Sequence, residues 1–326
     1  MRGAVTGIGR LLLALPLIAA AGCMHAPADP APRPAPKVVT PPPDANPAPP
    51  PAADKPSASE TTAAPSARSA EIAAFYRKAE ADLRARGHLR RDRGAGMTVS
   101  REDLVRDFMA IAFHDEPPGS SPVPAPLRRW SEPVRVGLTF GDSVPPAQRI
   151  RDRRDVVDLL DRLARASGHS VSLTGETGNI DVFFVSEDER PALRKELARR
   201  LPGLPAADLD RILSMPRSLF CAAYAWGRDG RADYAQAVVL IRAEHPTLLR
   251  QSCIHEEIAQ SMGLAADSYD ARPSIFNDDE EFALLTQHDE TLLRILYDPR
   301  LTPGMNAEQA LPIVQTIAAE LTGATS

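Results

Sequence analysis

The chain has 326 residues, and its 43 Asp and Glu residues outnumber its 38 Lys and Arg residues to give a net charge of −5. This weakly acidic chain has no basic cluster dense enough to indicate a nucleic-acid partner. Fourteen of the 32 prolines fall within residues 24–69, which contain no Phe, Trp or Tyr, so the chain divides into a tail and one region long enough to bury a full core.

The first 23 residues have the pattern of a secretory signal peptide. Arg2 and Arg10 provide positive charge, and the apolar segment 11–20 is too short to span a bilayer. The segment ends in Ala20-Ala-Gly-Cys23, which resembles a bacterial lipobox with Ala20 where leucine is usual. The resemblance implies that Cys23 is lipidated and becomes the new N-terminus. Ordinary signal cleavage after a small residue is the alternative.

Residues 24–69 consist mainly of Pro, Ala, Ser and Thr, and we predict a disordered linker there. Such a sequence cannot bury enough apolar surface to offset the entropy of ordering it. Its polyproline-like segments reach at most about 3.1 Å per residue, so the linker can act as a tether that holds a globular domain away from a membrane surface. The globular domain is predicted to cover residues 70–326.

Hydrophobic periodicity predicts both helices and strands in this domain. We expect helices at 70–86, after a capping box that begins at Ser100, at 147–166, at 190–200, at 206–215 and at 308–321. We expect strands at 134–140, 170–173 and 180–185, and a hairpin formed by 218–226 and 236–242. The predicted fold class is therefore α+β with a mixed sheet.

A long helix at residues 247–263 is the centre of the prediction. Pro246 precedes it, no Gly or Pro interrupts it, and Gly263 ends it. At 100° per residue, Glu256 and Gln260 lie one turn apart on a face that also carries apolar side chains. This placement indicates a cleft or a buried hydrogen-bonded pair. His255 lies closer to the apolar stripe, as expected of a packed residue.

The segment Glu256-Glu257-Ile-Ala-Gln260-Ser-Met-Gly263 resembles the zincin motif H-E-x-x-H-x-x-G with both histidines replaced. The later Ser274-Ile-Phe276 resembles the metzincin Met-turn, with Phe276 in place of Met. Over about residues 108–305 the chain also resembles a bacterial family known only as domain of unknown function 2927, through Ser274-Ile-Phe-Asn-Asp-Asp-Glu-Glu-Phe-Ala-Leu-Leu-Thr286 and Tyr297-Asp-Pro-Arg300. The zincin resemblance implies a zincin-like single domain whose long helix carries a degenerate site.

In the zincin frame, two of the three zinc ligands are missing. A catalytic zinc takes three protein ligands of the His, Cys, Asp or Glu type. Glu256 occupies the first position, but Gln260 at the second is a poor ligand and Ala266 at the third offers no ligand atom. Glu257 stands where the general base would be, with no metal-bound water to activate. We therefore expect no metal, and Glu256 and Glu257 are only candidate catalytic residues.

The acidic segment 265–290 is a second place to look for a metal. It holds eight acidic residues and a single base, Arg272. Oxygen ligands suit calcium, but the spacing between Asp267 and Glu281 is not that of an EF-hand loop. We expect solvated charges and helix caps instead, with a short helix beginning at residues 278–281 and a cap formed by Thr286 and Asp289.

Cysteine usage indicates an oxidising compartment. Cys23 would carry the lipid, which leaves Cys221 in the predicted hairpin and Cys253 in the central helix. A disulfide between these neighbouring elements is expected, and two buried thiols are the alternative.

These features predict a lipoprotein of the bacterial cell envelope, anchored in a membrane by its N-terminal lipid, with its domain facing the periplasm or the exterior. The expected role is binding or scaffolding with an envelope protein or a cell-wall component, by a pseudoenzyme that needs no cofactor. Two enzymatic functions are alternatives: a secreted metallopeptidase with an atypical ligand set, and a non-metal cell-wall hydrolase.

Overall fold

The computed structural model describes residues 64–115, 123–200, 206–228, 231–277 and 279–323. The signal peptide, Cys23 and nearly all of the linker predicted at 24–69 lie outside the described residues. Within these ranges, no helix has both the length and the apolar character needed to cross a membrane.

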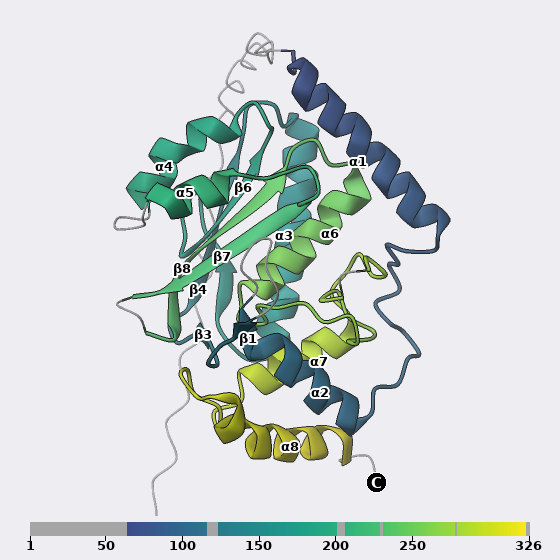
Figure 1. Ribbon diagram of the computed structural model, residues 1–326, viewed down its shortest axis with the longest axis vertical. Coiled ribbons are helices and arrows are strands. Elements are labelled where there is room, and N and C mark those ends of the chain that lie inside the picture. The colour runs from purple at the N-terminus through teal and green to yellow at the C-terminus, as the bar shows by residue number, and fades with distance from the viewer. Residues whose placement is uncertain (1–63, 116–122, 201–205, 229–230, 278, 324–326) are drawn as a thin grey trace, which may run out of the picture. The chain divides into compact units, whose positions relative to one another are not determined.

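A six-stranded mixed sheet organises the described part of the chain (Figure 1). Five strands are parallel and lie in the order β3 (Arg129–Trp130), β8 (Asp233–Arg242), β6 (Ile180–Val185), β4 (Val134–Phe140) and β5 (Val171–Leu173). The sixth strand, β7 (Cys221–Gly227), runs antiparallel to β8. A separate two-stranded sheet pairs β1 (His114–Asp115) with β2 (Val123–Pro124).

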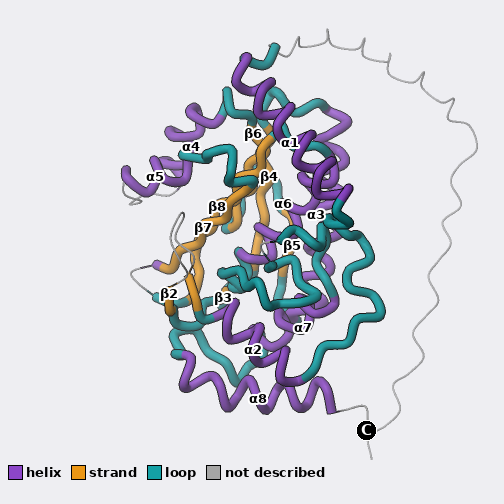
Figure 2. Tube along the Cα trace, turned by 45° about the vertical axis from the view of Figure 1, so that its right-hand side comes forward, coloured by secondary structure: helices purple, strands orange, loops and turns teal. Residues whose placement is uncertain are grey.

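The helices are bounded as follows: α1 (Ala67–Ala85), α2 (Arg101–Ala112), α3 (Pro146–Ser167), α4 (Leu193–Arg200), α5 (Ala206–Leu213), α6 (Thr247–Gln260), α7 (Gln287–Leu296) and α8 (Ala307–Gly323). A 3-10 turn (Arg190–Ala192) leads into α4. In the tube view the helices surround the central strands (Figure 2).

Helices cover both faces of the sheet because its central strands are apolar on both sides. Every residue of β6 is buried, as is typical of a parallel strand between two layers. Phe183 and Val185 pack against α4 and α5, whereas Val182 and Phe184 belong to the main core with α3 and α6. Along one strand the side chains alternate between the two helical layers.

The direction of the chain across the sheet changes between β4 and β6. After β4 the chain passes through α3 to β5, on one side of β4. After β6 it passes through α4 and α5 to β7 and β8, on the opposite side of β6. The loops that leave β4 and β6 therefore diverge at the carboxyl edge of the sheet, a topological switch point.

Most predicted elements are confirmed, and the mixed sheet is confirmed with them. The capping boxes at Ser100 and Thr286 are both formed. The first helix begins at Ala67, three residues before the predicted start. The strands predicted at 170–173 and 180–185 do not pair with each other, because β4 lies between them.

The short helix predicted to begin at residues 278–281 is wrong. Asp278 lies outside the described residues, and residues 279–281 are not helical. Glu280 has a φ of 59°, in the left-handed region that a right-handed helix cannot contain.

Candidate functional site

The central helix α6 is capped at its start by another helix. Its N-cap residue is Pro246, which makes no side-chain cap. Instead Oε2 of Glu80, on α1, accepts hydrogen bonds from the backbone N–H groups of Leu248 (3.1 Å) and Leu249 (3.0 Å). A carboxylate at this end satisfies unpaired amides and interacts favourably with the helix dipole.

At its other end, α6 stops where the backbone leaves the helical region. Gln260 is the last helical residue, and Gly263 has a φ of +123°. A Cβ atom at position 263 would lie 2.3 Å from the carbonyl oxygen of Arg128. Glycine is therefore required at position 263 because of its backbone conformation and because the backbone of Arg128 approaches it closely.

His255 is a packed residue, as predicted. Its side chain is nearly buried, and its Nδ1 accepts a hydrogen bond of 3.1 Å from the backbone N–H of Leu285. Burial, with the nearby charges of Arg162 and Arg93, lowers the pKa of His255 to about 3. The imidazole is therefore neutral at physiological pH and holds the loop that precedes α7.

Glu257, rather than Glu256, is the deeply buried acid of the pair. Glu257 is 6% exposed, and Glu256 is half-buried. Burial raises the pKa of the Glu257 carboxyl well above its usual value, and the negative charges of Asp267 and Glu280 raise it further. On the helical wheel Glu256 and Gln260 share a face, but a wheel of one helix does not include Asp267 and Glu280, which lie near Glu257.

Gln260 pairs with Asp267, which lies beyond the end of α6. Its Nε2 donates a hydrogen bond of 2.9 Å to Oδ1 of Asp267, seven residues later. Ala266, at the third ligand position of the zincin frame, is fully buried. The Gln260 amide thus stabilises the turn after α6. Ala266, the third ligand position of the zincin frame, belongs to the core.

The turn that resembles the Met-turn is held by Asp289 of α7. Oδ1 of Asp289 accepts from the Ser274 hydroxyl (2.6 Å), and its Oδ2 accepts from the backbone N–H of Ile275 (3.1 Å) and from that of Thr286 (2.7 Å). Phe276 is completely buried, and its carbonyl accepts from the Ser268 N–H at 2.8 Å. Asp289 therefore joins the turn to the start of α7.

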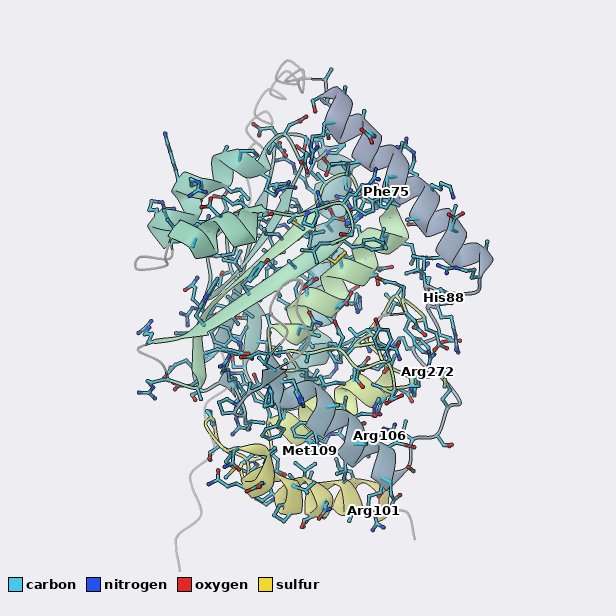
Figure 3. All side chains as sticks on the ribbon, viewed as in Figure 1. Phe75, His88, Arg101, Arg106, Met109 and Arg272 are labelled. Carbon is cyan, nitrogen blue, oxygen red and sulfur yellow. A yellow bond between two sulfur atoms is a disulfide. The ribbon has the colours of Figure 1, made fainter. Side chains whose placement is uncertain are left out.

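Several acids of segment 265–290 are paired with arginines. Arg272 contacts Asp279 and Glu281, and Arg90 binds Glu281 at 2.7 Å (Figure 3 labels Arg272). Arg93 and Arg162 bind Glu290. The cap predicted from Thr286 and Asp289 is confirmed, and Asp289 is fully buried there. Among the described residues, no group of three His, Cys, Asp or Glu side chains could hold a metal ion.

The Cys221–Cys253 disulfide is confirmed. It joins β7 to α6 with a Cα–Cα distance of 5.8 Å across a sequence separation of 32 residues. Both cysteines are buried, and the imidazole of His245 lies 3.8 Å from Sγ of Cys253. The antiparallel edge strand and the central helix are therefore covalently linked.

The site residues proposed from the sequence thus come together around α6, with partners that the sequence did not identify. Glu256, Glu257, Gln260 and Gly263 lie on or directly after α6, and Phe276 lies in the loop before α7. Asp267 and Glu80 were missed as partners because they lie in other segments, and no local pattern marks them.

Comparison with known proteins identifies the region that contains these elements. A family model described as "Protein of unknown function (DUF2927)" matches residues 101–316, about two thirds of the chain. The match extends beyond the predicted 108–305 at both ends, and it leaves α1 outside. No curated protein matches the chain.

Proposed function

We propose, for a chain that belongs to the DUF2927 family of proteins of unknown function, a binding or scaffolding role at the bacterial cell envelope. The domain is zincin-like in its plan, with a mixed sheet followed by a long helix that carries a degenerate motif. The domain binds an envelope protein or a cell-wall component and does not catalyse a zinc-dependent reaction. The proposed anchor is a lipid on Cys23, with the domain facing the periplasm or the exterior.

The Gln260–Asp267 hydrogen bond is the observation that carries this proposal. In an active zincin the second ligand must direct a lone pair at the metal. Here the amide of Gln260 donates to a carboxylate at 2.9 Å, and the following position, Ala266, is buried. The groups at the degenerate motif are used to fold the chain after α6, which supports a structural role for the motif.

The environment of Glu257 supports the same conclusion. A general base in a metallopeptidase must be ionised and must reach a water molecule. The Glu257 carboxyl is nearly buried and its pKa is raised well above its usual value, mainly by burial. An enclosed carboxyl whose neutral form is favoured by burial is unsuited to accept a proton from water.

The first test is a zinc analysis of the full chain, purified without added metal or chelator. We expect zinc far below one ion per chain and no hydrolysis of casein, because two of the three ligand positions lack a suitable ligand. Glu256→Ala should change neither result, and neither should Glu308→Ala, an exposed control on α8. Stoichiometric zinc that is lost in Glu256→Ala together with a peptidase activity would overturn the proposal.

The second test concerns the anchor at Cys23. Wild-type protein expressed in a bacterial host should incorporate labelled fatty acid and enter the detergent phase, since a lipidated cysteine with its acyl chains partitions into micelles. Cys23→Ser should abolish the labelling and move the protein to the aqueous phase. Unlabelled, freely soluble wild type would refute the anchor while leaving the proposal for the domain untouched.

A further inference from the structure

The carboxyl edge of the parallel strands contains a cavity that none of the α6 motif residues lines. Its volume is about 570 Å³, within the range of about 300–1,000 Å³ that is usual for small-ligand sites. The loops after β4, β6 and β8 line it through Asp142, Ser186 and Glu244. This is the place where the connections from β4 and β6 diverge, and open α/β sheets bind ligands at such switch points.

One wall of this cavity is a fixed carboxylate, Glu189. Its oxygens accept hydrogen bonds from the backbone N–H and hydroxyl of Ser143 (2.7 and 2.6 Å) and of Ser186 (2.8 and 2.9 Å). Burial opposes ionisation, but these four bonds outweigh it and lower the pKa of Glu189. A Cβ at Gly141 would lie 2.2 Å from Glu189 Oε2, so only glycine leaves space for the carboxylate there.

Three further carboxylates line the same cavity, and one of them, Asp188, accepts hydrogen bonds from the backbone N–H and the hydroxyl of Ser66. Oε1 of Glu244 accepts from the Ser69 hydroxyl and the Glu187 N–H, both at 2.7 Å. Its Oε2 is buried and has no hydrogen-bond partner among the described residues. Asp142 is exposed at the mouth of the cavity. A buried carboxylate oxygen without a donor is costly, and a cationic ligand would supply the missing donor.

The remaining lining consists of small side chains, and none of the described residues that line the cavity is basic. Four alanines, Pro65, Ser66 and Ser69 form it, from the start of α1 and from the loop after β8. The nearby Arg68 and Arg242 instead bind Glu187 at 2.7 and 3.1 Å. The cavity therefore offers carboxylates at its polar side and methyl groups elsewhere, which fits an alkyl chain that ends in an ammonium group better than a bare metal ion.

We propose that the cavity at the carboxyl edge of β4, β6 and β8 binds a primary alkylammonium group, with Asp142 and Glu244 as its charged partners. The group comes from a free diamine or from the side chain of a lysine-like residue. The site is separate from the α6 motif, and the proposal does not depend on the function proposed above.

Isothermal titration of the full chain tests this, with 1,5-diaminopentane and Nα-acetyl-lysine amide as probes. We expect saturable binding that weakens as NaCl is raised, because the contact is ionic. Asp142→Asn and Glu244→Gln should each weaken it by about tenfold, the effect of losing one charge-assisted hydrogen bond. Binding of both probes assigns the ammonium group alone, whereas binding of only 1,5-diaminopentane assigns a free diamine.

Asp158→Asn is the matched control, because Asp158 is an exposed acid on α3 that does not line the cavity. It should leave the affinity unchanged. Thermal unfolding of each variant separates lost binding from lost folding. The proposal is refuted if neither probe binds, if Asp142→Asn and Asp158→Asn weaken binding equally in folded protein, or if CaCl₂ binds there and the amines do not.

Discussion

A chain that carries Cys221→Ser should unfold with a free energy about 2–4 kcal/mol lower than the parent chain. The bond closes a segment with a sequence separation of 32 residues, and its loss increases the freedom of the unfolded chain. It also joins two buried elements, β7 and α6, and α6 carries most of the candidate site. Urea denaturation in a Cys23→Ser background measures the effect without interference from the lipid.

Two further chains make this measurement specific. Cys221→Ser/Cys253→Ser should resemble the single variant, since both lack the same bond. The parent chain in the presence of dithiothreitol should move towards the variants once the disulfide is reduced. If the parent and Cys221→Ser unfold at the same urea concentration, the disulfide does not form in the purified protein, and thiol counting under denaturing conditions should then find both cysteines free.

Glu257→Gln should stabilise the protein at pH 7, by about 1.4 kcal/mol for each pH unit over which only the folded chain keeps the Glu257 proton. Burial raises the pKa of the Glu257 carboxyl well above its usual value, and the charges of Asp267 and Glu280 raise it further. At a pH between the usual pKa of glutamate and the raised pKa in the folded chain, the unfolded chain loses the Glu257 proton and the folded chain keeps it. Stability therefore falls as pH rises through this window, and glutamine, which does not titrate, avoids the loss.

The pH dependence of this effect provides a second check. Below the usual pKa of glutamate, Glu257 is protonated in both the folded and the unfolded chain, so the advantage of Glu257→Gln should disappear. Glu256→Gln, one residue earlier and only half-buried, is the matched control and should have a small effect at either pH. Chemical denaturation from pH 4 to pH 8 measures both; a destabilised Glu257→Gln at pH 7 would show that the buried carboxyl is ionised and paired.

The features that the sequence predicted well are those determined by neighbouring residues. The capping box at Thr286 depends on Asp289 three residues later, and the buried strand β6 is recognisable from six consecutive residues. The disulfide needed only the compartment and two neighbouring elements. In contrast, the position of β4 between β5 and β6 depends on parallel pairings with separations of about 40 residues, which periodicity does not encode.

The partners within the candidate site were unpredictable for the same physical reason. Gln260 reaches Asp267 because the chain turns at Gly263, which has a positive φ. The helical wheel does not apply to residues after this turn. Glu257 is enclosed by a loop whose path depends on Asp289 and on arginines from distant segments. A wheel locates faces of one helix, but the tertiary fold decides which face is covered.

The contact between Glu80 and the first amides of α6 extends the folded domain beyond the region that the family model matches. The family model matches the chain from residue 101. The preceding helix α1 nevertheless caps the central helix, and its Tyr76 belongs to the same hydrophobic cluster as Leu249 and Ala283. A chain trimmed to the shared region would expose that cluster and leave α6 without its cap. The segment before the matched region therefore contributes both a helix cap and core packing to the folded domain.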